Sequence, residues 1–171
     1  MVDSSVGGKT AINLKSGKNL CGAFYQPIAV FADCETLSTL PQETFNEGCA
    51  EIIKYGMISD ADFLEFLQNN SIKENIEYVI KRCVEIKGSI VNCDEFDKRE
   101  RKLLNFGHTV GHAIEKCSNY SVSHGNAVAI GMAIATKGAY EVGMSEEDFS
   151  KRAFAWRKRG TVLRNLKLLG F

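Results

Sequence analysis

Apolar residues recur every three to four positions through most of the chain after Pro41, and no proline interrupts that stretch. This spacing places apolar side chains on one face of an α-helix, whereas a proline inside a helix removes a hydrogen bond and breaks it. The pattern is present at residues 45–58, 60–68, 74–91, 99–117 and 125–142. The sequence therefore predicts a mainly α-helical domain in which the helices bury their apolar faces as a bundle.

Residues 1–42 show a different pattern, with a polar, glycine-bearing loop near the start and strand-like apolar runs that Pro27 divides. The second run, residues 27–33, ends at Asp33, as a buried strand does where it leads into a functional loop. We therefore expect a short β lead-in that forms the edge of another, α/β domain. Residues 43–171 are expected to form the helical domain.

The length of 171 residues suits one domain with a buried core, or one domain and part of another. An apolar content of 44% and a charged content of 25% are those of an ordinary globular protein. No apolar run approaches the roughly 20 residues that a membrane-spanning helix needs, and no signal-peptide pattern opens the chain. We therefore expect a cytoplasmic protein with no membrane partner.

The formal net charge of zero conceals an uneven distribution of charge. Residues 151–171 hold seven of the 21 Lys and Arg and no acidic residue, which leaves 14 basic against 21 acidic residues before position 151. Such a segment is more often a charged helix that docks on an acidic body than a nucleic-acid site. Because the chain has no recognised nucleic-acid motif and no aromatic platform, we expect no nucleic-acid partner.

Six cysteines are spread through the chain, and none of them forms a CxxC pair. Several lie inside apolar runs, as small buried side chains do. We therefore expect buried, reduced thiols rather than disulfides or a cysteine metal site.

The residues GGKT at positions 7–10 resemble the end of a phosphate-binding loop, but the first glycine of the GxxxxGK[ST] pattern is absent. A P-loop is therefore disfavoured. A turn that binds an anion through Lys9 and backbone N–H groups remains possible.

Two of the three histidines lie four residues apart in LNFGHTVGHAIE, residues 104–115. On a continuous helix with about 100° per residue, Arg101, Asn105, His108 and His112 fall within a stripe about 60° wide. A helix that aligns these four polar groups is expected to present a polar site.

Gly107 and Gly111 lie in the same predicted helix. Each glycine costs a helix interior roughly 1 kcal/mol relative to alanine. Their presence indicates that another segment approaches this part of the backbone closely.

A catalytic site for a divalent metal needs about three protein ligands and one open coordination position. His108 and His112 could both bind such an ion from one helix face. Glu51 is a candidate third ligand on one face with Lys54, and the alternative for this pair is a solvated ion pair. His124, in VSHGNAVAIGM, is the remaining histidine. The spacing alone leaves open which histidines bind the ion.

The chain closely resembles the 3-dehydroquinate synthase family, whose members catalyse the second step of the shikimate pathway of aromatic amino-acid biosynthesis. The segments that carry the resemblance, in order, are DSSVGGKTAIN, GKNLCGAFYQP, LPQETFNEGCAEIIKYG, LNFGHTVGHAIE and HGNAVAIGM. The resemblance runs from Asp3 to about Met144. It implies the C-terminal helical domain of a two-domain α/β + α enzyme, preceded by a strip of its NAD-binding domain.

The resemblance also implies roles for individual residues. The zinc or cobalt ligands that it implies are Glu51, His108 and His124. The catalytic residues that it implies are His112, Asp97 and Lys54, with His112 left free of the metal to transfer protons. The substrate-binding residues that it implies are Asp3, Lys9, Asn19, Lys54, Lys87, Arg101, Asn105, His108, His112 and His124. The NAD-binding residues that it implies are Lys18, Asn19, Thr36, Leu37, Ser38 and Thr39.

The family reaction converts DAHP, a seven-carbon sugar acid phosphate, into 3-dehydroquinate and phosphate. The resemblance implies transient oxidation by NAD, elimination of phosphate, re-reduction and an intramolecular aldol closure. Members of the family are commonly dimeric, carry a long NAD-binding domain before DSSVGGKT and continue beyond the LLGF end. We therefore expect this chain to be a fragment that lacks the NAD-binding domain and is inactive alone.

Three positions depart from the family pattern: Asp97 replaces a usual glutamate and reaches one methylene less far, Arg99 replaces a glycine, and Asn126 replaces the glutamate of HGEAV.

The alternatives within the enzyme class are the sister cyclases that make inosose or valiolone and the metal-dependent glycerol dehydrogenases. A non-catalytic metal-binding helical domain is the alternative of another class.

Particular residues bear on the alternatives within the enzyme class. Asn105 and Lys87 favour a dehydroquinate synthase, because the sister cyclases tend to change those pocket positions. Glu51 argues against the dehydrogenases, which favour aspartate as the metal ligand.

Overall fold

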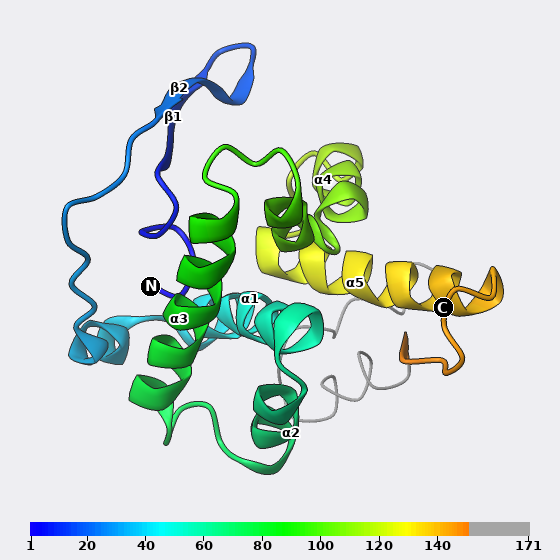
Figure 1. Cartoon of the computed structure of the whole chain (residues 1–171). Helices are drawn as coiled ribbons and strands as arrows, with labels where there is room; N and C mark the ends of the chain where they lie inside the picture. The colour runs from blue at the N-terminus through cyan, green and yellow to red at the C-terminus, as the bar shows by residue number, and fades with distance from the viewer. Residues whose placement is uncertain (151–171) are drawn as a thin grey trace.

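The computed structural model describes residues 1–150, so the basic segment predicted to dock as a helix lies outside the described residues (Figure 1). The helices are α1 (Gln42–Ser59), α2 (Ala61–Asn69), α3 (Ile76–Cys93), α4 (His108–Cys117) and α5 (His124–Glu141), with 3₁₀ helices η1 (Cys34–Thr39) and η2 (Glu100–Asn105). The strands are β1 (Lys9–Leu14) and β2 (Gly17–Phe24). The prediction of a mainly helical fold with a short β lead-in is confirmed. No helix in this range is long and apolar enough to cross a membrane.

Helix α1 lies at the centre of the helical domain, in contact with α2, α3, η2 and α5. Its residues 49–56 are all buried. The main core is formed by Val2, Ile52, Tyr55, Phe63, Leu67, Val79, Ile80, Cys83, Ile86, Ile90 and Leu104. A smaller cluster of Ile53, Val128 and Met132 joins α1 to α5. Because α1 is covered on more than one side, polar residues in its middle turns are buried with the apolar ones.

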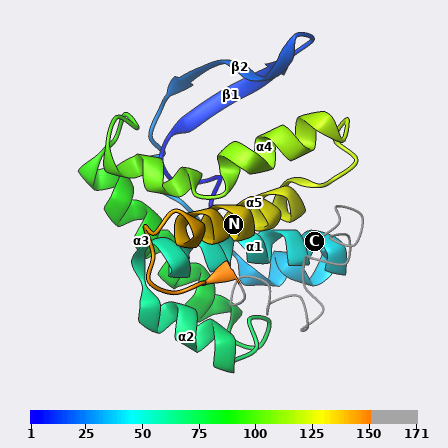
Figure 2. The same cartoon turned by 90° about the vertical axis from the view of Figure 1, so that its right-hand side faces the viewer.

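Helices α4 and α5 lie side by side, and glycines at their contact let the two backbones approach closely (Figure 2). A Cβ atom on Gly131 would lie 2.0 Å from the carbonyl oxygen of Gly107, and one on Gly111 would lie 3.2 Å from the backbone of Ala127. The close approach predicted at Gly107 and Gly111 is therefore confirmed.

The prediction of one continuous helix over residues 99–117 is wrong. The 3₁₀ helix η2 ends at Asn105, and Gly107 has a left-handed φ of 78° immediately before α4 begins. Glycine adopts this conformation without the steric cost that a side chain would add. The single polar stripe calculated for a continuous helix is therefore wrong too, because the break separates Arg101 and Asn105 from the two histidines of α4.

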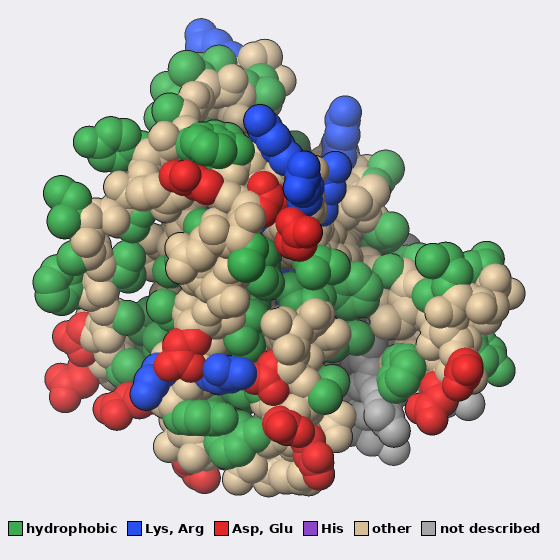
Figure 3. Space-filling model, in the orientation of Figure 1, with side chains coloured by type: hydrophobic (Ala, Val, Ile, Leu, Met, Phe, Trp, Pro, Cys, Tyr) green, Lys and Arg blue, Asp and Glu red, His purple; other side chains and the backbone are tan. Residues whose placement is uncertain are grey.

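The prediction of a buried strand at residues 27–33 is also wrong. This stretch forms no strand, and the side chains of Ile28 and Phe31 are 105% and 95% exposed. The antiparallel β1–β2 hairpin before it projects from the helices and exposes Ile12 and Leu20 (Figures 1 and 3). The lead-in thus has the apolar pattern of a packed segment, but the helical domain does not cover it.

All six cysteines are free in the structure, and their reduced state stays a prediction. Cys49 and Cys83 are buried among the helices, whereas Cys21, Cys93 and Cys117 are exposed. The prediction of burial is therefore wrong for these last three, which lie on the hairpin or at helix ends, where neighbouring elements do not cover them.

Gly131→Ala tests the close helix contact. The added Cβ would overlap a backbone carbonyl that cannot rotate away, so we expect a loss of about 1–3 kcal/mol in the free energy of unfolding. Urea denaturation followed by circular dichroism measures it. Gly138→Ala is the matched control on the same helix, because no atom of residues 1–150 lies within 4 Å of the position that a Cβ would take there. Equal unfolding midpoints for the two variants would contradict this packing.

Candidate metal centre

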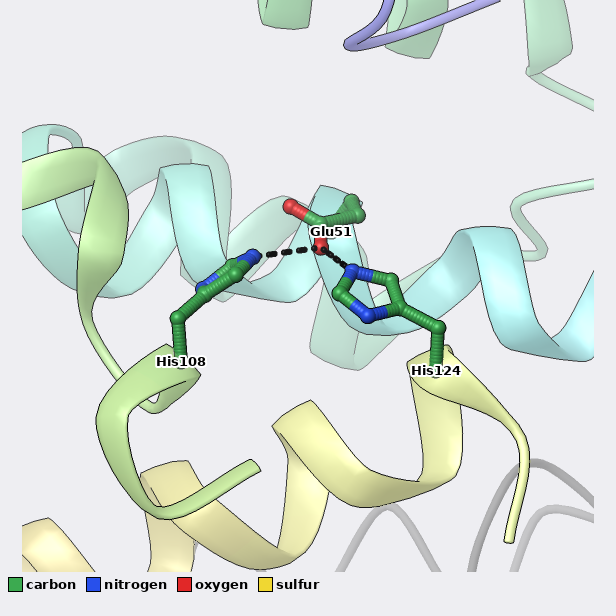
Figure 4. A group of neighbouring side chains, drawn as sticks. All are labelled: Glu51, His108 and His124. Atoms are coloured by element: carbon green, nitrogen blue, oxygen red, sulfur yellow. Dashed lines mark ion pairs between the residues drawn. The ribbon is translucent and has the colours of Figure 1, made fainter. Parts of the chain in front are cut away.

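Side chains from three separate helices converge on one point (Figure 4). Glu51 comes from the middle of α1, whereas His108 and His124 are the first residues of α4 and α5. The Nε2 atoms of His108 and His124 lie 3.4 and 3.5 Å from the same oxygen of Glu51, Oε1. One ligand atom from each residue lies within 4.8 Å of those from the other two. The structure thus brings together the three residues predicted as metal ligands.

The donor set of this cluster fits a divalent cation. Oε1 of Glu51 is buried and has no hydrogen-bond partner among the described residues. A buried carboxylate oxygen without a partner is costly, and a bound cation would satisfy it. One carboxylate oxygen and two imidazole nitrogens also form a typical catalytic zinc set, which leaves a coordination position open for substrate. The residues therefore suit the predicted metal, and their role as ligands stays a prediction.

The Glu51 carboxylate is held in its ionised form. Burial alone would raise its pKa, but the imidazoles of His108 and His124 and the ammonium of Lys54 outweigh burial and hold the pKa far below its ordinary value of 4.5. Nζ of Lys54 lies 2.5 Å from Oε2 of Glu51. Lys54 is 1% exposed and Glu51 8%, so the alternative of a solvated ion pair is wrong.

A buried polar network continues from Lys54 to the start of the chain. The hydroxyl of Tyr55 donates a hydrogen bond of 2.5 Å to Oδ1 of Asp3, and Nζ of Lys87 lies 3.0 Å from the same oxygen. Burial would raise the pKa of Asp3, but the charges of Lys54 and Lys87 lower it below its ordinary value. Three of the predicted substrate-binding residues, Asp3, Lys54 and Lys87, therefore lie together beside Glu51.

Arg101 attaches the first loop of the chain to the helical domain. Its guanidinium donates hydrogen bonds of 2.5 Å to the carbonyl oxygens of Gly7 and Glu95, while its Nε is buried without an acceptor among the described residues. Its backbone N–H donates to the carboxylate of Asp94, which also accepts two neighbouring backbone N–H groups. Asp94 therefore fixes the turn that places Arg101.

Asp97 lies in the same turn, between Asp94 and Arg101. The ammonium of Lys9 pairs with Oδ2 of Asp97, whereas Oδ1 of Asp97 is buried without a hydrogen-bond partner among the described residues. Asp97 and Asn105 line one hollow with Met57 and Phe106. Of the predicted site residues, Lys9 thus contacts Asp97, and Asn105 lines the same hollow as Asp97.

His112 lies one turn beyond His108 on α4 and is exposed. Its ring centroid is 5.5 Å from that of His108 and 6.0 Å from that of His124. Among residues 1–150, no group of three candidate ligands contains both His108 and His112. This geometry favours His112 as a neighbour of the metal rather than a ligand of the same ion, and its catalytic role stays a prediction.

The residues predicted to bind NAD lie at two ends of the lead-in. Lys18 and Asn19 belong to β2 near the hairpin turn, whereas residues 36–39 belong to η1, and the extended stretch 25–33 separates the two groups (Figure 1). Leu37 packs against the main core. The structure does not bring these residues together, and their role stays a prediction.

Two buried polar residues of this region, Tyr55 and Glu115, are not among those predicted from the sequence. Tyr55 is fully buried and bonded to Asp3, and its signal in the sequence is its place one turn beyond Glu51. Glu115 has its Oε2 atom 3.2 Å from Nδ1 of His124, and its signal is its place three residues beyond His112.

The fold is that of the sugar-phosphate cyclases. A crystal structure of 2-deoxy-scyllo-inosose synthase complexed with carbaglucose-6-phosphate, NAD⁺ and Co²⁺ matches 96% of this chain and 46% of its own, with a TM-score of 0.86 and 33% identity. The 2-epi-5-epi-valiolone synthase of Streptomyces hygroscopicus, solved with NAD⁺ and Zn²⁺, matches 92% of this chain and 46% of its own, with a TM-score of 0.82 and 25% identity.

The family within this class follows from sequence. The family model described as 3-dehydroquinate synthase C-terminal matches residues 48–167, and the one described as 3-dehydroquinate synthase N-terminal matches residues 1–47. The chain belongs to the 3-dehydroquinate synthase family. The position of the predicted domain boundary, between residues 42 and 43, stays a prediction.

Individual relatives agree with this assignment. The 3-dehydroquinate synthase of Thermoanaerobacter sp. (strain X514) is 48% identical over 92% of this chain and 46% of its own length. That of a Nitratiruptor species is 51% identical over 88% of this chain and 44% of its own. The chain thus spans about half the length of the curated relatives it matches.

Replacing single histidines tests the ligand set. We expect His124→Ala to abolish stoichiometric binding of Zn²⁺ or Co²⁺, because it removes one of three ligands, whereas His112→Ala leaves binding largely intact. Isothermal titration calorimetry of the two variants and the wild-type chain measures the stoichiometry. Equal loss of metal in both variants would instead favour a site built on His108 and His112.

Asp94→Asn tests the turn that carries Arg101. The backbone N–H groups of Lys98, Arg99 and Arg101 lower the pKa of Asp94 below its ordinary value of 3.8. The ionised carboxylate therefore stabilises the fold at any pH above the ordinary pKa of 3.8. This stabilisation is lost as the pH falls through the lower pKa that Asp94 has in the folded protein. We expect the variant to unfold at lower urea than the wild type at neutral pH, with a difference that shrinks in acid. A pH-independent difference would contradict this role.

Proposed function

We propose that this chain forms the metal- and substrate-binding part of a 3-dehydroquinate synthase, a lyase that converts DAHP into 3-dehydroquinate and phosphate. The observation that carries the proposal is the convergence of Glu51, His108 and His124 beside buried Lys54 and Lys87. The family assignment supports it, since the curated relatives at 46–51% identity are 3-dehydroquinate synthases.

The cofactors of the proposed enzyme are NAD and a divalent zinc or cobalt ion. The related cyclases were solved with NAD⁺ and with Co²⁺ or Zn²⁺, which supports this choice. When bound, the ion supplies polarisation of a substrate oxygen and NAD supplies reversible hydride transfer. In this chain Glu51, His108 and His124 would hold the ion.

The other site residues would bind the anionic substrate and move protons. Lys54, Lys87 and Arg101 provide three cationic groups whose charges suit a phosphate and a carboxylate. His112 is exposed beside the metal ligands, where an imidazole can transfer a proton to or from bound substrate. Asp97 would accept a proton from bound substrate on Oδ1, while Lys9 pairs with its Oδ2.

The partners of the proposed enzyme are its NAD-binding domain and a second copy of the whole protein. The apolar side chains exposed along the lead-in, among them Ile12, Ile28 and Phe31, suit packing against the NAD-binding domain. The cytoplasmic location inferred from the sequence belongs to this proposal.

A sister sugar-phosphate cyclase is the second candidate, because solved cyclases of that kind share the fold. The higher identity to dehydroquinate synthases favours the first candidate. The two candidates differ in substrate. DAHP tests the first, and a hexose 6-phosphate, whose carba-analogue is bound to the solved inosose synthase, tests the second.

Phosphate release tests the proposed reaction. With DAHP, NAD⁺ and Zn²⁺ we expect the chain alone to bind NAD weakly and to release little phosphate. Completed with the remaining half of the Thermoanaerobacter relative, it should release phosphate from DAHP and not from a hexose 6-phosphate. His112→Ala in this chimera should lower kcat by about 10²–10⁴-fold, as loss of a proton-transfer group does.

Glu141→Gln is the control in the same chimera, because Glu141 lies exposed at the far end of α5 from His124. Robust turnover by the chain alone would contradict the expected need for the NAD-binding domain. A chimera that folds, binds the metal and acts on the hexose phosphate but not on DAHP would favour the sister cyclase.

A further inference from the structure

The two ring nitrogens of His124 face two different carboxylates. Nε2 lies 3.5 Å from Oε1 of Glu51, on the side of the proposed metal, whereas Nδ1 lies 3.2 Å from Oε2 of Glu115 on α4. Glu115 is 6% exposed, although its helix lies at the surface. A buried charge from the neighbouring helix therefore contacts the edge of the ring that faces away from Glu51.

We propose that Glu115 is a positioning residue for His124, an inference that rests on the proposed metal centre. A neutral imidazole carries one N–H. When Nδ1 donates that N–H to Glu115, the lone pair of Nε2 is directed at the metal position. A carboxylate partner of this kind fixes the tautomer and the orientation of a ligating histidine and makes it a stronger donor to the metal.

His108, the other proposed ligand, has no carboxylate partner of the kind that Glu115 gives His124. Nδ1 of His108 lies 3.2 Å from the backbone carbonyl oxygen of Phe106, a neutral acceptor two residues away. The side chain of His108 is 14% exposed, whereas that of His124 is 46% exposed. Packing therefore restrains the first ring, and the second depends more on its charged partner.

The backbone around Glu115 is itself fixed. Its carbonyl oxygen accepts hydrogen bonds from the backbone N–H of Tyr120, at 2.7 Å, and from the hydroxyl of Ser118, at 3.0 Å. The glycine contact between α4 and α5 sets the spacing between the helix that carries Glu115 and the helix that carries His124. Glu115 thus acts from a rigid position, as an orienting group must.

Glu115→Gln tests the inference, because it keeps the volume of the side chain and removes its charge. We expect the affinity of the chain for Zn²⁺ to fall about 10–100-fold, measured by competition with a chelator. Heteronuclear NMR of the zinc-loaded chain should show the His124 Nδ1–H signal shifted or lost. Glu141→Gln, the same change at an exposed position of α5, should leave both measurements unchanged.

Three outcomes overturn the inference. If the wild-type chain binds one ion and Glu115→Gln matches it in affinity and NMR signal, Glu115 does not position His124 and the proposed function stands. If the wild-type chain binds two ions and Glu115→Gln loses one of them, Glu115 is itself a ligand, as the second candidate group of His112, Glu115 and His124 would allow. If the wild-type chain binds none, the proposed metal centre fails as well.

Discussion

The side chain of Glu51 places a negative charge in the middle of α1, with 8% of the residue exposed. Helix α1 contacts helices on more than one side, so this carboxylate cannot turn to solvent without disrupting the centre of the fold. A buried charge is tolerated when it is paired and hydrogen-bonded. Lys54 pairs with one of its oxygens. The imidazoles of His108 and His124 face the other oxygen, which has no hydrogen bond among the described residues and which a bound cation would satisfy. The arrangement of the site follows from this requirement.

The geometry around Glu51 depends on how closely α4 and α5 pack. His108 and His124 are the first residues of these two helices, so the separation of the helices sets the separation of the imidazoles. Gly131 allows the backbone of α5 to contact that of Gly107, where any side chain would collide. The same contact brings Glu115 to the far edge of the His124 ring. The close packing of α4 and α5 thus determines the geometry of the proposed metal site.

The sequence predicted the helices because apolar periodicity reports the face that each helix buries. It did not predict the break before His108, since the left-handed conformation of Gly107 depends on the contact with α5. The four-residue spacing of His108 and His112 suggested that both bind the same metal ion. Periodicity cannot show which residues of different segments meet around an ion, so it gave no sign of His124 as a ligand. The set of Glu51, His108 and His124 came from the family resemblance. Tyr55 and Glu115 were missed because their roles depend on partners distant in sequence.

X-ray absorption spectroscopy of the chain loaded with one equivalent of Zn²⁺ tests whether Glu51, His108 and His124 share one ion. We expect a coordination sphere of one carboxylate oxygen and two imidazole nitrogens at about 2.0–2.2 Å, completed by solvent. A sphere with sulfur at about 2.3 Å, or with a third imidazole, would contradict it. A third imidazole would mean that His112 joins the other two histidines on the ion, and the division between metal binding and proton transfer would be lost.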